Sequence, residues 1–319
     1  GGKKNDVSVA TVAMDQMVFP KPIMYGDLID LRGTVVDVGA SSIAVNVDVR
    51  RIQFGSKEPQ LVASALVFMV AVDSSLKAAK VVPALELDPS DRVWLESRHK
   101  HVKEARAHFN EMLAFEKTLT APDANVETLL RIQPKLFQRD ASKPFSTTIP
   151  TTRHNVNRLF FPSHLNLNNT VFGGELLRWM EAHAVHCGRA FSGNRQGIFT
   201  IGMHAIQFTQ PVYKTDWMRL EAHVVYAKRS TMEVDVQVIA DRDGKPVTTN
   251  RANFVLASLD EAGQKLALPS GLHVDPTDDY KWMRRHVLAE RRYQTMHEAR
   301  VRMQEAAAVP AANAGLNVV

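Results

Sequence analysis

The stretch TVAMDQMVFPKPIMYGDLIDLRGTVVDVGASSIAVNVDV, Thr11 to Val49, returns later in the chain as TIGMHAIQFTQPVYKTDWMRLEAHVVYAKRSTMEVDVQV, Thr200 to Val238. When the second copy is aligned 189 positions after the first, 12 of the 39 residues are identical. The identical pairs include Met14/Met203, Phe19/Phe208, Pro22/Pro211, Asp27/Asp216, Leu31/Leu220, Val35/Val224, Ser41/Ser230 and Val45/Val234. A repeat reveals architecture before any secondary-structure assignment is made, so we expect two domains on one plan.

Each copy contains three alternating or continuously apolar segments, which is typical of an antiparallel meander. They cover residues 29–38, 43–49 and 61–72 in the first copy, and 218–227, 232–239 and 252–259 in the second. A long amphipathic helix precedes the second meander, beginning at Gly173-Gly174. These elements predict an α+β fold, a sheet wrapping a helix.

Further helices are predicted after each copy, at residues 91–119, 123–133 and 278–306. The runs DPSD (Asp88–Asp91) and DPTD (Asp275–Asp278) correspond at an offset of 187, because the first copy has a loop two residues longer. We expect each run to supply an N-cap Asp and a Pro at the first helical position.

Length and composition favour an ordinary two-domain globular protein of 319 residues with 45% hydrophobic residues. We predict a first domain at 1–73, a helical linker at 74–146, a second domain at 147–260, and a C-terminal helix and tail at 261–319. The single Cys187 excludes an intrachain disulfide and a multi-cysteine metal cluster. A net charge of +5 does not by itself indicate nucleic acid, and the longest apolar run, 61–72, is shorter than the ~20 residues of a membrane span.

The first copy lacks the strand and helix that precede the meander in the second copy. Subtracting 189 from residues 166–189 gives positions upstream of Gly1. We therefore expect an upstream segment, or a helix from a partner chain, to pack against Val12, Met14 and Val45, since an open apolar face is an aggregation liability.

The segment NLNNTVFGGELLRWMEAHA, Asn166 to Ala184, resembles the acyl-CoA thioesterase hotdog family, whose pattern is N-x-x-G-x-x-F-G-G-x-L-x-x-W-M-D. The hairpin Lys228 to Val238 is also similar to that family. Tandem copies with helical inserts most resemble the mitochondrial double-hotdog acyl-CoA thioesterases. Two residues depart from the pattern: Asn169 stands in place of Gly, and Glu181 in place of the catalytic Asp.

The chemistry of thioester hydrolysis gives these residues candidate roles. Gly173 and Gly174 would expose N–H groups at a helix N-terminus, which stabilise a developing oxyanion. Glu181 would activate water or attack the carbonyl, and Asn166 would orient the reacting groups. The resemblance implies that Asn and the acid of one site come from different domains, so we expect both helices to be required.

Each candidate also has a structural interpretation. The glycines could serve only to let the helix pack tightly on the sheet. The side chain of Glu181 is one methylene longer than that of Asp, which could misplace its carboxylate. Lys228 and Arg229 could contact the phosphates of coenzyme A or be exposed tips of a hairpin. We predict no metal site, although His183, His186 and Cys187 lie close together on one helix. The arginines of the last helix are most simply a solvated face.

The leading hypothesis is an acyl-CoA hydrolase that needs no cofactor, coenzyme A being part of the substrate. The alternative is an inactive thioesterase-like structural subunit of a larger mitochondrial assembly. An acyl-carrier dehydratase ranks last, because it would want a His-based acid/base pair and only His164 and His183 are near. The resemblance implies a mitochondrial location and a homo-oligomer or membership of a complex. The acyl chain length cannot be inferred.

Overall fold

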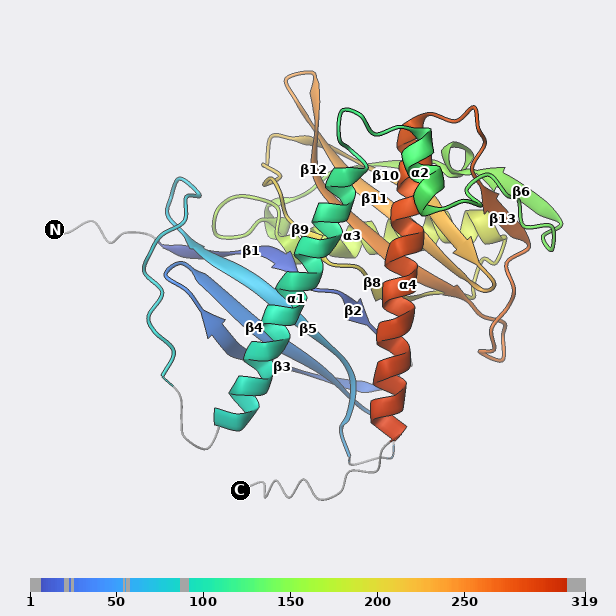
Figure 1. The fold of residues 1–319 in the computed structure, drawn as a ribbon. Helices are drawn as coiled ribbons and strands as arrows, with labels where there is room; N and C mark the ends of the chain where they lie inside the picture. Colours follow the sequence, from blue (N-terminus) through green and yellow to red (C-terminus); the bar gives the residue numbers. More distant parts are fainter. Residues whose placement is uncertain are drawn as a thin grey trace.

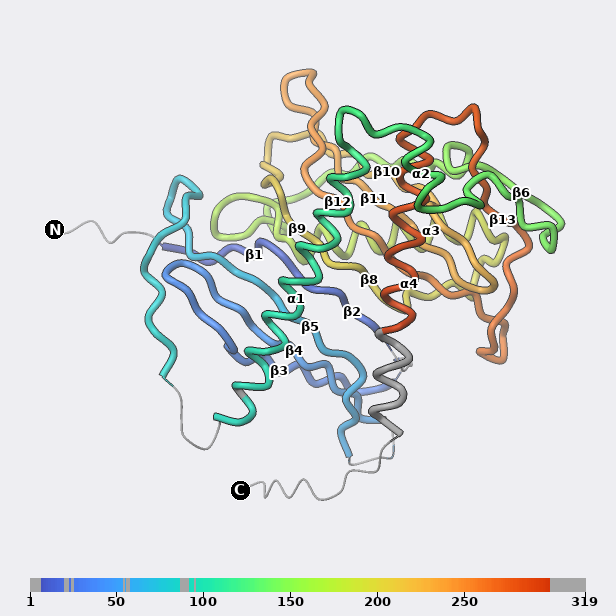
Figure 2. Tube along the Cα trace, in the orientation of Figure 1, coloured from blue at the N-terminus to red at the C-terminus, as the bar shows by residue number. Residues whose placement is uncertain are grey.

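The computed structural model describes residues 7–19, 23, 26–53, 55, 58–86 and 92–308, without the side chains of residues 95 and 299–308. Two antiparallel sheets stand side by side, with the long helices α1 (Arg92–Thr118) and α4 (Tyr280–Ala308) on their common outer side (Figures 1 and 2). The α+β fold expected from the repeat is confirmed, and the two sheets are consistent with a double hotdog.

The first sheet has the strand order β3-β4-β5-β1-β9, and the second has the order β2-β8-β12-β11-β10-β7. The strands of the first copy are β1 (Ser8–Met14), β2 (Met17–Val18), β3 (Leu28–Val38), β4 (Ser42–Ile52) and β5 (Gln60–Val72). Those of the second copy are β7 (His154–Arg158), β8 (Ile198–Met203), β9 (Ile206–Gln207), β10 (Trp217–Lys228), β11 (Thr231–Arg242) and β12 (Lys245–Ser258). A small parallel pair, β6 (Phe145–Thr148) with β13 (Ser270–His273), completes the strands. All six predicted meander segments are strands.

The repeat extends to irregularities of strand pairing. A β-bulge falls between Val35 and Asp37 in the first copy, and between Val224 and Tyr226 in the second, 189 positions later. Adjacent meander strands share a second register shift, which follows Val49 in one copy and Val238 in the other. Bulges are specific backbone features that bend a strand, so their coincidence shows that the copies share a backbone plan as well as a polarity pattern.

The two copies exchange short strand contacts across an internal pseudo-two-fold axis. Met14 in β1 pairs with Ile206 in β9, and Met17 in β2 pairs with Met203 in β8, which is the same pairing with the copies exchanged. The neighbouring backbone hydrogen bonds repeat this symmetry, since Phe208 N–H donates to the Val12 carbonyl and Phe19 N–H to the Ile201 carbonyl. The two sheets therefore associate edge to edge.

Helix α3 (Gly173–Ser192) packs on the inner face of the second sheet and forms the centre of its core. Its buried face carries residues three and four positions apart, as expected for an amphipathic helix: Leu176, Trp179, Met180, His183, Ala184 and Cys187. It ends where Gly193 adopts φ 69° and donates its N–H to the Arg189 carbonyl, a left-handed C-terminal cap.

The first sheet is covered on its outer face by α1, through Val36, Ala44, Leu66 and Val102. On its inner face the described residues place no helix, and Leu31 is 65% exposed. Leu220, the counterpart of Leu31, is fully buried beneath α3. The same residue at the same register position therefore has opposite environments in the two domains. The expected covering of this face stays a prediction.

The predicted helices after each copy form close to their expected ends, including α2 (Val126–Ile132), which begins with an Asn125 capping box. The prediction for DPTD is wrong, because Asp275–Asp278 forms a turn in which Asp275 Oδ1 accepts from Thr277 N–H. Helix α4 begins two residues later at Tyr280, and Asp279 Oδ1 accepts from Lys281 N–H. The run DPSD lies outside the described residues. Among those described, no helix is long and apolar enough to cross a bilayer. The predicted domain boundaries stay predictions.

Leucine truncation at the two equivalent positions tests this difference in burial. We expect Leu220→Ala to lower the free energy of unfolding by about 2–5 kcal/mol, because it opens a cavity under α3. Leu31→Ala should change it by less than ~0.5 kcal/mol, because most of that side chain is already in solvent. Urea unfolding followed by circular dichroism measures both. Equal losses would contradict the open inner face of the first sheet.

Candidate functional site

The first turn of α3 presents two backbone N–H groups without acceptors. Phe172 precedes the helix and supplies no side-chain cap, while its carbonyl accepts from Glu175 and Leu176 N–H. Within the described residues, no hydrogen bond is donated by Gly173 or Gly174 N–H. Free N–H groups and the positive end of the helix dipole make this an anion-binding position.

Both glycines also have a packing reason to be glycine. A Cβ added at Gly173 would lie 3.2 Å from the ring of Phe208, and one at Gly174 would lie 2.5 Å from the ring of Phe172. The packing interpretation of the glycines is thus compatible with the chemical one. Phe208 also donates its N–H to Val12 in β1, so the start of α3 lies beside the first domain.

Asn166 holds the loop that leads into α3. Its Oδ1 accepts from Asn168 N–H at 2.9 Å and Thr170 N–H at 3.2 Å, and its Nδ2 donates to Thr170 Oγ1 at 2.9 Å. The two backbone donors fix the orientation of the amide, leaving one Nδ2 hydrogen to point elsewhere. Asn166 is therefore a rigidly held donor as well as a structural element of the loop.

Asn169 explains one departure from the family pattern. Its φ is 56°, in the left-handed region, where Gly is favoured and Asn is among the few other residues tolerated. The loop of residues 166–170 therefore keeps the backbone shape that a glycine would give. This substitution leaves the approach to α3 intact.

Glu181 lies half-buried two turns into α3, where its Oε1 accepts a short hydrogen bond from Thr200 Oγ1 in β8. The sequence interpretation did not select Thr200 as a site residue. A signal was present, because Thr200 is identical to Thr11 in the repeat. A hydroxyl that donates to one carboxylate oxygen leaves the other oxygen for a reacting group.

The predicted residues divide between two places along α3. Glu181 is seven residues beyond Gly174, which corresponds to about 10 Å along the helix axis. A single carbonyl group cannot contact both the helix N-terminus and this carboxylate at hydrogen-bond distance. The structure therefore places Asn166 in the loop that leads to Gly173 and Gly174, and it places Glu181 with Thr200 in a second group.

The pseudo-two-fold axis relates these groups to the first domain. Thr200 precedes Ile201, whose carbonyl accepts from Phe19 N–H, and Phe19 is the counterpart of Phe208. Because Phe208 packs on the start of α3, a helix in the equivalent place on the first sheet would begin near Phe19. Such a helix would direct its N-terminus towards Glu181.

Lys228 and Arg229 lie at the opposite end of α3. Arg229 occupies the turn after β10, and Ser230 accepts from Ser258 N–H beside the loop that follows α3. Lys228 Nζ lies 5.5 Å from the ring centroid of Tyr293 in α4. A 20-residue helix is about 30 Å long, so these side chains are not brought to the Gly173–Gly174 end.

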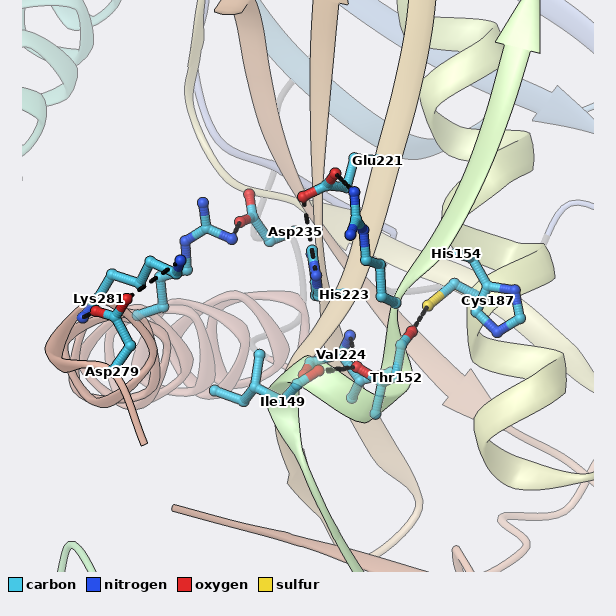
Figure 3. A network of polar contacts seen from close by, with 12 residues as sticks. Ile149, Thr152, His154, Cys187, Glu221, His223, Val224, Asp235, Asp279 and Lys281 are labelled. Atoms are coloured by element: carbon cyan, nitrogen blue, oxygen red, sulfur yellow. Dashed lines mark hydrogen bonds and ion pairs between the residues drawn. The ribbon is translucent and has the colours of Figure 1, made fainter. Parts of the chain in front are cut away.

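The histidine and cysteine side chains of α3 are occupied by structural contacts. Cys187 donates from Sγ to the Thr152 carbonyl at 3.5 Å, beside His154 (Figure 3). Burial raises the pKa of Cys187 to about 12, which excludes a reactive thiolate at neutral pH. His183 Nε2 lies 3.0 Å from the His154 carbonyl oxygen. No set of three or more His, Cys, Asp or Glu among the described residues could hold a metal ion.

His164 lies close to the beginning of α3 but is held by its neighbours. Its Nδ1 accepts from Phe161 N–H at 3.0 Å, and its ring meets Trp179 edge-on at 5.1 Å. His183 is engaged elsewhere, one turn beyond Trp179. The two histidines considered for a dehydratase therefore contact different groups and form no pair with each other in the described structure.

The second half of the chain is a hotdog domain, defined by a curved antiparallel sheet around one long helix that opens on two glycines. Residues 168–247 match the family model of the thioesterase superfamily. The resemblance drawn from Asn166–Ala184 is confirmed.

The similar proteins include three named acyl-coenzyme A thioesterases. Thioesterase 11 of Mus musculus is 26% identical over 80% of this chain and 41% of its own length. Thioesterase 2, chloroplastic, of Humulus lupulus is 29% identical over 73% and 54%, and thioesterase 9, mitochondrial, of Bos taurus is 25% identical over 91% and 68%. The chain spans about half the length of the first two relatives.

Substitution of Asn169 tests the left-handed position in the loop. Asn169→Gly should leave stability unchanged or raise it slightly, because glycine adopts positive φ without strain. Asn169→Ala should lower the free energy of unfolding by about 1 kcal/mol, the cost of this conformation for a residue with a Cβ. Thermal unfolding compares the two variants, and a loss in the Gly variant as large as in the Ala variant would contradict the backbone argument.

Proposed function

We propose that this chain hydrolyses acyl-CoA thioesters to a carboxylic acid and free coenzyme A. The observation that carries the proposal is the first turn of α3, where Gly173 and Gly174 present free N–H groups at the end of the loop that Asn166 holds. The names of the three relatives support the same activity. Nothing in the comparisons favours the inactive structural subunit, since these relatives are named as thioesterases.

The reaction needs an oxyanion site and a base. The thioester carbonyl oxygen would accept hydrogen bonds from the helix N-terminus, which stabilises the negative charge that develops on it. A carboxylate such as Glu181, held by Thr200, would take a proton from the attacking water. The tetrahedral intermediate then collapses and the C–S bond breaks. The proton passes from the protonated side chain of Glu181 to the departing thiolate.

The two groups on α3 belong to two different sites in this proposal. The Gly173–Gly174 end requires an acid from a second helix, and Glu181 requires a helix N-terminus opposite it. Both would be supplied across the pseudo-two-fold axis by a helix on the inner face of the first sheet, or by another chain. A homo-oligomer or a larger complex is one way to supply this second helix.

Location and substrate contacts complete the proposal. The name of the bovine relative favours mitochondria, although the hop relative is named as chloroplastic. No cofactor is proposed, because water and the protein groups balance the reaction. Lys228 and Arg229 are proposed only as contacts for a distal part of coenzyme A, given their place at the far end of α3.

Three variants test the site. Glu181→Gln and Asn166→Ala should each lower turnover of a medium-chain acyl-CoA by at least ~100-fold at the one site that contains the substituted residue, the scale expected for a lost general base or positioning group, and the double variant should lose turnover at both sites. Asn166→Asp keeps acceptor oxygens for the loop but removes the free Nδ2 donor, so it separates chemistry from loop structure. We expect it to lose turnover while keeping the wild-type melting temperature.

The outcomes distinguish function from structure. Turnover is measured as free thiol released from short, medium and long acyl-CoAs, with the whole assembly in which the chain occurs. Full activity in Glu181→Gln and Asn166→Asp would overturn the assignment of these residues. An intact protein that binds coenzyme A but hydrolyses none of the substrates would overturn the enzyme proposal.

A further inference from the structure

Strand β3 forms one edge of the first sheet, and the outer side of this strand is open. In the sheet order β3-β4-β5-β1-β9 it has a single neighbour, β4. The residues from Leu31 to Val35 are all exposed, so no described segment covers this edge. Leu28 and Leu31 are each 65% exposed. An open edge strand that carries apolar side chains favours pairing with another chain.

The second copy shows what this edge can accept. Strand β10, the counterpart of β3, has a further antiparallel neighbour, because β7 pairs with it along residues 218–222. Leu220 thereby faces Val156 across the two strands. The equivalent stretch of β3 is residues 29–33, and among the described residues no strand takes the place of β7 there. The shared backbone plan therefore has a position for one more strand beside β3.

The sequence of β3 is complementary to itself in the antiparallel direction. A two-fold axis perpendicular to the sheet pairs two copies of an edge strand so that residue i faces residue j and j faces i. With Leu31 on that axis, each Leu31 faces its copy. Ile29 faces Gly33, whose missing side chain leaves room for it. Asp30 faces Arg32 of the other copy, and opposite charges directly across two strands stabilise their pairing.

The charges select this register. A shift of two residues in either direction would set Asp30 against Asp30 or Arg32 against Arg32, and like charges at directly opposite positions are destabilising. A shift of one residue would turn the inner face of one copy towards the outer face of the other. Pairing centred on Leu31 avoids both penalties.

The alternation of charge continues across the neighbouring strands. Within each copy, Asp30 lies opposite Arg50 of β4. Arg32 lies opposite Asp48 of the same strand. Joining two β3 strands therefore gives a row across four strands in which the signs alternate: Arg50, Asp30, Arg32 and Asp48. In the single chain, Arg32 Nε donates to Asp30 Oδ2 at 2.8 Å, and 61% of the Arg32 side chain is exposed, so this pair can exchange partners with a second copy.

We propose that two copies of this chain associate through their β3 edges, centred on Leu31, and join their first sheets into one continuous sheet. The association buries Leu31 and gives each β3 the neighbour that β10 has in β7. The paired stretch is short, so we expect a dissociation constant in the micromolar range. The interface lies at the edge of the first sheet farthest from the second domain (Figure 1), and the proposal does not depend on thioester hydrolysis.

Sedimentation velocity of the intact chain over a range of concentrations measures this association. Arg32→Asp sets acids against acids across the interface, and Asp30→Arg sets arginines against arginines. Each variant should raise the dissociation constant of the dimer at least ~10-fold, because both cross-strand pairs become repulsive. Lys245→Asp, at the exposed start of β12, changes the net charge as Arg32→Asp does. This control should dimerise as the wild type does.

An equimolar mixture of the Arg32→Asp and Asp30→Arg chains provides the sharpest test, because the acids of one chain then face the arginines of the other. We expect heterodimers with about the wild-type affinity, while far-UV circular dichroism and the melting temperature check that each variant folds. A folded wild-type chain that stays monomeric would overturn the proposal, and it is the outcome expected if another strand covers this edge. Wild-type dimerisation in both single variants, or a mixture that stays monomeric, would also overturn it.

Discussion

Two short antiparallel contacts, Met14 with Ile206 and Met17 with Met203, join the two sheets and fix how the two domains lie relative to each other. Each contact is only two residues long. The pseudo-two-fold axis makes each contact the counterpart of the other, so a shift in the pairing of one would also shift the pairing of the other. They close an edge of each sheet against the other domain, where an unpaired edge would invite association with foreign strands. They also set the start of α3 beside β1 and set Thr200, with Glu181, beside β2.

The same symmetry leaves the outer faces free to differ. In the first copy α1 packs on apolar residues and forms ion pairs with Asp37 and Asp48, while in the second copy α4 packs on the buried charges Glu233 and Asp235. Burial alone would raise the pKa of Glu233, but Arg292 and His204 outweigh it and bring that pKa below its ordinary value. A buried ion network is seldom a source of net stability compared with an apolar core.

Sequence reasoning worked best where a property depended on residue spacing. The offset between the copies predicted the paired sheets and the strands, and the pattern around Gly173-Gly174 predicted the central helix, because periodicity and small residues at a helix start are local signals. It failed at DPTD, where Asp275 accepts a hydrogen bond within a turn. The helix begins only after Asp279, which accepts from Lys281 N–H. It also missed Thr200, whose role depends on a carboxylate 19 residues away in the chain.

The geometry of α3 limits how any catalytic site can be assembled here. Its N-terminal N–H groups and its carboxylate are about 10 Å apart, so in the proposed function one helix would serve two sites and complete neither alone. A second helix related by the pseudo-two-fold axis would run in the opposite direction and would set each acid against the other helix's N-terminus. The free inner face of the first sheet, with Leu31 exposed where Leu220 is buried, is the place where such a helix would lie. The apolar surface that would stabilise that helix and the candidate catalytic groups that would need it thus lie on the inner faces of the two paired sheets.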